Sequence, residues 1–98
     1  MVEVWWTYLV RCADGTYYVG STQNVSERLK AHNGGRAARY TALRRPVRLV
    51  YTESYPNQRA AVRRERQLKR WGHAKRKALV EADKSLLMKL SRSRENAK

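Results

Sequence analysis

The chain contains neither phenylalanine nor isoleucine, and this limits the side chains that can build its interior. Hydrophobic residues make up 42% of the 98 residues, and 11 of these are alanines. Valine, leucine, tryptophan and tyrosine must therefore fill the core. Because a chain of this length can bury one core but not two, we predict a single domain with helices packed on a sheet.

The charge of the chain is strongly positive, at +14 near neutral pH. Such an excess indicates an anionic partner, with nucleic acid as the first expectation and an anionic membrane surface as the second. No run approaches the roughly 20 apolar residues that cross a bilayer, and the acidic Glu3 is not typical of a secretory signal. The single cysteine, Cys12, excludes an internal disulfide and a zinc site built from cysteines. We therefore predict a cytoplasmic protein that does not enter a membrane.

The first third of the chain predicts a β-hairpin followed by a helix. Residues 4–11 are rich in β-branched and aromatic side chains, and the Asp14-Gly15 turn leads to a second strand that begins at Tyr17. Asn24, with Glu27 three positions later, resembles a capping box at the start of a helix over residues 25–32. We expect this helix to end at the glycines that follow.

The remainder predicts one more strand and two helices. Residues 34–46 form a basic segment that we interpret as an exposed connection, and the alternation over residues 47–55 predicts a third strand. A helix is expected from residue 58 to 71, with a further helix from 73 to about 90 and a disordered basic tail at 91–98. The prediction is an α+β domain over residues 1–90, in which a small three-stranded sheet is flanked by helices. Its order is strand, strand, helix, strand, helix, helix.

One carboxylate stands within a basic helix, at Glu65 in the run Arg63-Arg64-Glu65-Arg66. A local ion pair at the surface of the helix would explain it. The alternative is a ligand for a divalent cation, since hard cations prefer carboxylate oxygen. A single carboxylate completed by water and substrate phosphate would suit Mg²⁺.

Arg28 and His32 lie four residues apart and therefore share one face of the first predicted helix. A guanidinium offers paired donors to a phosphate, and an imidazole exchanges a proton near neutral pH. The structural alternatives are that Arg28 pairs with an acid such as Glu27, and that His32 is a polar residue at the rim.

Three tyrosines lie on the predicted hairpin, at Tyr8, Tyr17 and Tyr18. Because neighbours on a strand face opposite sides, only one of Tyr17 and Tyr18 can share a face with Tyr8. Aromatic residues in a short hairpin are usually core residues. A buried phenol still needs a hydrogen-bond partner, so each is also a candidate donor or acceptor in a site.

Three basic segments are candidates for contact with a phosphate backbone: the connection after the first helix, the outer side of the second helix and the final stretch rich in lysine and arginine. Such contacts do not depend on nucleotide sequence and weaken steeply with salt. A solvated surface is the alternative, but the net charge exceeds what solubility requires. The candidates are Arg36, Arg39, Tyr40, Arg44, Arg45, Arg63, Arg66 and Arg70.

Taken together, these positions resemble the GIY-YIG nuclease domain over residues 6–71. The tyrosine of the first signature is Tyr8, and the second signature appears as Tyr18-Val19-Gly20. The arginine of the family's helix falls on Arg28, the residue one turn later on His32, and the glutamate of the downstream helix on Glu65. Residues 44–51 resemble the small stand-alone bacterial members of the family.

The sequence departs from the family pattern at three positions. Trp6 and Thr7 stand where the first signature has glycine and isoleucine. Ser21 stands where excision-repair relatives have a lysine, so one candidate phosphate contact is absent.

The resemblance implies phosphodiester hydrolysis with one divalent ion, Mg²⁺ or else Mn²⁺. Glu65 would hold the metal and Arg28 would neutralise charge on the phosphate, while Tyr18 would orient the water or the metal shell. The base would be Tyr8 or His32, and we favour Tyr8 supported by His32. We expect a structure-selective or weakly selective DNA endonuclease linked to DNA repair or processing, with RNA as the alternative substrate.

Two non-catalytic functions remain alternatives. One is a binding module for DNA, RNA or the ribosome in which Tyr40 or Trp71 stacks on a base. The other is a small basic protein that binds an acidic partner, in which Glu65 and Arg28 would share no role.

Overall fold

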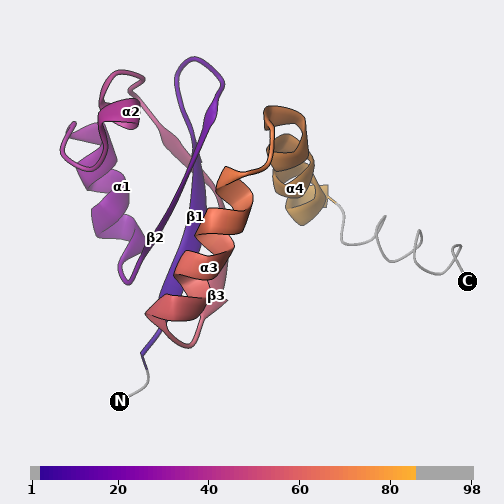
Figure 1. The fold of residues 1–98 in the computed structure, drawn as a ribbon. Helices are drawn as coiled ribbons and strands as arrows, with labels where there is room; N and C mark the ends of the chain where they lie inside the picture. Colours follow the sequence, from indigo (N-terminus) through magenta and orange to yellow (C-terminus); the bar gives the residue numbers. More distant parts are fainter. Residues whose placement is uncertain (1–2, 86–98) are drawn as a thin grey trace, which may run out of the picture.

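The fold is built on an antiparallel sheet of three strands in the order β2-β1-β3 (Figure 1). The computed structural model describes residues 3–85. The strands are β1 (Trp5–Arg11), β2 (Tyr17–Thr22) and β3 (Arg48–Tyr55). The helices are α1 (Val25–Asn33), α2 (Arg39–Ala42), α3 (Gln58–Lys69) and α4 (His73–Ser85). The predicted α+β class and three-stranded sheet are confirmed.

The alternation of β1 divides the interior into two clusters, one on each face of the sheet. Tyr8 and Val10 lie on the face covered by α1, where Leu29 packs against them. Leu9 lies on the opposite face, where it joins Leu68 of α3 and Val80 of α4. Helices on both sides of β1 therefore exclude water from it. Figure 1 shows α1 and α3 flanking the sheet near β2, which is an edge strand.

Local signals position the hairpin and the helix starts as the sequence predicts. Gly15 adopts a φ of 87°, a conformation that favours glycine in the turn. The Asn24 side chain accepts from the Glu27 amide at 3.0 Å, and Asn57 caps α3 in the same way. In a complete capping box the Glu27 side chain would accept from the backbone amide of Asn24. Here the Thr22 hydroxyl accepts from that amide instead, at 3.1 Å.

The segment interpreted as an exposed connection contains a helix that the prediction missed. α2 spans only four residues, Arg39–Ala42, so it has too few turns to show a helical period. It is anchored by Thr41, whose side chain is fully buried. The interpretation of residues 34–46 as wholly exposed is therefore wrong.

The C-terminal predictions are tested only in part. α4 begins at His73 as expected and is described to Ser85. The rest of that predicted helix and the tail at 91–98 lie outside the described residues, and the domain boundaries stay a prediction. Within residues 3–85, none of the helices is long and apolar enough to cross a membrane.

Candidate active site

The site is built around Tyr8, which reaches the edge of the sheet across Gly20. The two residues are direct partners in the pairing of β1 with β2. A Cβ atom at position 20 would lie only 2.6 Å from Cζ of Tyr8. The missing side chain of Gly20 therefore gives the phenol room to lie over β2.

The Tyr8 hydroxyl begins a chain of buried hydrogen bonds. Its Oη atom lies 2.7 Å from Nε2 of His32, and Nδ1 of His32 lies 2.7 Å from Oγ1 of Thr41. Thr41 in turn donates to the carbonyl oxygen of Ala38 at 3.1 Å. Tyr8, His32 and Thr41 are at most 2% exposed, so solvent does not compete for these contacts.

Burial changes the acid–base properties of both ring side chains. It raises the pKa of Tyr8 well above the ordinary value, and the charge of the nearby Arg28 offsets part of the shift. Burial also lowers the pKa of His32, and Arg28 lowers it further. Each group is therefore held in its neutral form near pH 7.

Tyr18 is the tyrosine that shares a face with Tyr8, whereas Tyr17 lies on the opposite face. The Tyr18 ring meets the edge of His32 at a centroid distance of 5.3 Å and stacks on Tyr40 of α2 at 6.0 Å. Tyr17 stacks on His73 at the start of α4. Of the two neighbouring tyrosines, it is therefore Tyr18 that lies beside Tyr8 and His32.

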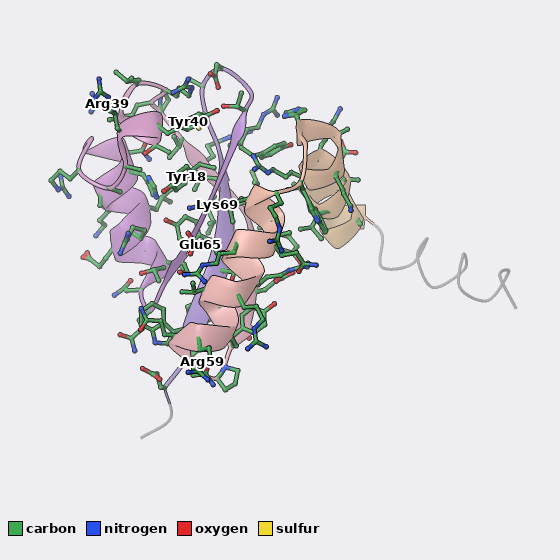
Figure 2. All side chains as sticks on the ribbon, in the orientation of Figure 1. Tyr18, Arg39, Tyr40, Arg59, Glu65 and Lys69 are labelled. Atoms are coloured by element: carbon green, nitrogen blue, oxygen red, sulfur yellow. The ribbon has the colours of Figure 1, made fainter. Side chains whose placement is uncertain are left out.

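Glu65 projects from α3 and is held by two neighbours. Oε1 accepts from the Ser21 hydroxyl at 2.7 Å, and Oε2 pairs with Nζ of Lys69 at 2.8 Å. The Lys69 ammonium also lies 5.5 Å from the centre of the Tyr18 ring. Figure 2 shows Glu65, Lys69 and Tyr18 between α1 and α3, where the side chains of both helices approach β2.

The predicted site residues lie around Tyr8 and the neighbouring edge strand β2. His32 is hydrogen-bonded to the Tyr8 hydroxyl, Glu65 is bonded to Ser21 of β2, and Arg28, Tyr18 and Glu65 influence the pKa of Tyr8. Arg28 is exposed and forms no ion pair among the described residues, so the alternative pairing with Glu27 is not seen. One edge of the sheet thus combines a cation, a buried proton acceptor and a carboxylate.

The donor set fits a divalent ion held by one carboxylate. No group of three or more His, Cys, Asp or Glu side chains that could hold a metal occurs within residues 3–85. Glu65 is partly exposed, and a cation, Lys69, already sits against its Oε2 atom. A metal here would take Glu65 as its protein ligand and the rest of its ligands from water and phosphate.

The predicted phosphate-binding residues differ in how far they are engaged within the protein. Arg44 pairs with Asp14 at 3.0 Å and lies 3.8 Å from the centre of the Tyr40 ring. Arg45 donates to the carbonyl of Ala42 at 2.9 Å. Arg36 and Arg39 are exposed.

The predicted arginines of α3 share one surface. Together with Arg59 they line an open hollow of about 630 Å³ on the outer side of this helix. Figure 2 shows Arg39 on α2 and Arg59 near the start of α3, with Glu65 between them in this view. The lining arginines are Arg59, Arg63, Arg66 and Arg70.

Four residues of the site were not identified from the sequence as members of it. Lys69 carried a signal, because it follows Glu65 by four positions on a helix. Gly20 was recognised only as part of a motif. Ser21 was noted only as a departure from the family pattern, and Thr41 carried no signal, since the partners of both residues are brought close only by folding.

Comparison with known proteins agrees with this geometry. Residues 4–78 match the family model of the GIY-YIG catalytic domain. The chain therefore belongs to the GIY-YIG family, whose domain is typically a nuclease.

Within that family, the chain is similar to small bacterial proteins named UPF0213. It is 40% identical over 74 residues to the UPF0213 protein of Bacillus pumilus, covering 76% of each chain. It is 41% identical over 73 residues to that of Staphylococcus aureus strain Mu3, covering 74% of this chain and 89% of the relative. The solution NMR structure of the UPF0213 protein BH0048 from Bacillus halodurans superposes with a TM-score of 0.55 at 35% identity, covering 84% and 87% of the two chains.

Proposed function

We propose that this protein is a metal-dependent endonuclease that hydrolyses phosphodiester bonds in DNA, with a structure-selective or weakly selective preference and a role in DNA repair or processing. The observation that carries the proposal is the convergence of Tyr8, His32, Arg28 and Glu65 at one edge of the sheet. A purely structural histidine and a surface ion pair would not need to meet at the same place.

Each side chain has a distinct task in this reaction. A divalent ion on Glu65, Mg²⁺ or Mn²⁺, would polarise the scissile phosphate and stabilise the departing 3′ oxygen. Arg28 is exposed and forms no ion pair among the described residues, so its guanidinium can neutralise charge that grows on the phosphoryl oxygens. The Tyr18 ring packs against His32 and lies beside the Lys69 ammonium, and in this reaction the Tyr18 hydroxyl would orient the attacking water.

The attacking water must lose a proton, and Tyr8 with His32 behind it is the acceptor pair. Nε2 of His32 contacts the Tyr8 hydroxyl, so a proton from the attacking water would reach His32 through that hydroxyl. Tyr8 alone is a poor base, because burial raises its pKa. Transfer of its own proton to His32, as it accepts one from water, avoids a free phenolate.

The basic surfaces supply affinity for the backbone. Arg36, Arg39 and the hollow on α3 present cations on either side of the site without a described acid against them. Contacts of this kind make the logarithm of affinity fall with the logarithm of salt concentration, by about 0.9 for each phosphate contacted. A slope that corresponds to only one or two contacts would contradict this part of the proposal.

The test is a cleavage panel at low salt with Mg²⁺ or Mn²⁺. The substrates are supercoiled plasmid, single strands, flaps, bubbles and a structured RNA. Glu65→Ala and Arg28→Ala should each abolish cleavage and retain most of the DNA affinity. Glu27→Ala and Lys30→Ala are matched controls, since both residues are exposed on α1. These two variant proteins should cleave like the wild type.

Three outcomes would overturn the assignment or part of it. Cleavage by Glu65→Ala at the wild-type rate would show that this carboxylate does not hold the metal. Tight, salt-sensitive binding with no product that depends on Glu65 would instead favour the non-catalytic binding module. Preferential cleavage of the structured RNA would replace DNA with RNA as the substrate.

A further inference from the structure

The short helix α2 contributes a side chain to the interior of the site. Thr41 is fully buried, and its hydroxyl contacts Nδ1 of His32 on the side of the ring away from Tyr8. The Tyr8 hydroxyl contacts the other ring nitrogen, Nε2. Both nitrogens of His32 are therefore engaged by hydroxyl groups, and each hydroxyl can either donate or accept.

The contacts of the two hydroxyls decide which nitrogen carries the proton. Thr41 has one hydroxyl proton, and it donates that proton to the carbonyl of Ala38 at 3.1 Å. It must then accept from Nδ1–H of His32, which leaves Nε2 unprotonated and able to accept from Tyr8. In this arrangement every proton of the chain has an acceptor.

The opposite arrangement leaves a proton without a partner. If Thr41 donated to Nδ1, then Nε2–H would donate to the Tyr8 oxygen, and the Tyr8 proton would need a new acceptor. Arg28, the other group against this hydroxyl, carries only donors. Among residues 3–85, no further acceptor contacts the Tyr8 hydroxyl, and an unsatisfied buried donor is costly.

We propose that Thr41 is a positioning residue that holds neutral His32 as the Nδ1–H tautomer, so that Nε2 is free to accept the proton of Tyr8. The tautomer follows from the hydrogen bonds alone, and its catalytic consequence rests on the proposed nuclease function.

The consequence is a directed path for the proton of the attacking water. As the water oxygen bonds to phosphorus and the bond from phosphorus to the 3′ oxygen breaks, the O–H bond of the water breaks and its proton passes to the Tyr8 oxygen. The departing 3′ oxygen takes a proton from solvent. The original Tyr8 proton moves to Nε2, which makes His32 an imidazolium. Nδ1–H remains bonded to Thr41, and the Thr41–Ala38 carbonyl contact orients a dipole that favours the new positive charge. The Nε2–H tautomer could not accept this proton.

The first measurement needs neither metal nor substrate. Long-range ¹H–¹⁵N correlation spectra of the full chain, at a pH where His32 is neutral, distinguish a protonated from an unprotonated ring nitrogen. The only other histidine is His73, which stacks on Tyr17 outside the site, and His73→Gln assigns its signals. We expect His32 to be protonated at Nδ1 and unprotonated at Nε2. Protonation at Nε2 would overturn the inference.

A pair of variants tests the role of the hydroxyl. Thr41→Val keeps the shape of the side chain but removes the acceptor for Nδ1–H, and we expect the Nε2–H tautomer to become populated. The turnover number for cleavage should fall by about 10- to 100-fold, less than the roughly 100- to 10,000-fold that a general base contributes, because Thr41 acts only through His32, while the KM for DNA stays unchanged. Thr41→Ser should restore both the tautomer and the rate.

These outcomes separate this inference from the proposed function. A Thr41→Val protein that keeps the Nδ1–H tautomer, or a Thr41→Ser protein that behaves like Thr41→Val, refutes the role of Thr41 even if Glu65-dependent cleavage is observed. The predicted tautomer in a protein that cleaves no nucleic acid would support the hydrogen-bond assignment and refute the nuclease.

Discussion

Replacement of Gly20 by alanine is the sharpest test of how this site is assembled. A Cβ atom at this position would lie 2.6 Å from Cζ of Tyr8, a separation that real Cβ atoms essentially never show. Tyr8 is 2% exposed and packs within a core cluster, so its ring has little space into which to move. The φ angle of Gly20 is not positive, so the conflict is one of space rather than of backbone strain.

The expected loss of stability follows from two effects. Overpacking of a core typically costs about 1–3 kcal/mol. Displacement of the Tyr8 ring also breaks its 2.7 Å hydrogen bond to His32, which adds about 1 kcal/mol. We therefore expect Gly20→Ala to lower the free energy of unfolding by about 2–4 kcal/mol, and to lower the Tm of a domain of this size by at least about 8 °C. Cleavage should be lost with it.

The assay is chemical and thermal unfolding of Gly20→Ala beside a matched glycine variant. Gly72 is exposed, and a Cβ atom at that position would have no neighbour within 4 Å, so Gly72→Ala should change stability by no more than about 0.5 kcal/mol. In a Tyr8→Leu background, which removes the ring, Gly20→Ala should cost under about 1 kcal/mol. Equal stability of the two alanine variants, or an unchanged cost without the ring, would refute the reasoning.

Three further perturbations test other parts of the molecule. Folding lowers the pKa of His32, so on acidification the unfolded chain takes up this proton before the folded chain does. The free energy of unfolding should therefore fall as the pH drops below about 6.5, by at most about 1.4 kcal/mol per pH unit. Urea titrations from pH 7 to 5 should show this slope in the wild type and not in His32→Gln. Lys69→Met removes the ammonium that competes for Glu65, so Mn²⁺ binding followed by electron paramagnetic resonance should tighten by about two- to fivefold, and weaker binding would contradict the competition. Asn57→Ala removes the cap of α3 and should cost about 1 kcal/mol in urea unfolding, with an unchanged midpoint counting against the cap.

Much of the fold could be predicted from local patterns along the chain. The β1–β2 hairpin follows from strand-forming residues around a turn that ends in Gly15, and the start of α1 follows from Asn24. These signals act over a few residues, so they do not depend on the rest of the protein. α2 escaped prediction for the same reason, since four residues are too short to display a period and Thr41 is held by a partner nine positions away.

The sequence by itself determined the kinds of groups that this site contains. Tyr8, Arg28, His32 and Glu65 could be named from residue chemistry, helical spacing and the order of the family's motifs. Their spacing along single elements decides which of them share a face, because the periods of helix and strand are set by the backbone.

Only the tertiary structure decided how those groups are connected. Ser21 and Glu65 are 44 positions apart, and they meet because β2 is an edge strand against which α3 packs. Tyr8, His32 and Thr41 come from a strand and two helices, and their order in the hydrogen-bond chain depends on which atoms burial places within 3 Å of one another. Such contacts are set by packing across the whole domain, and no local pattern of residues encodes them.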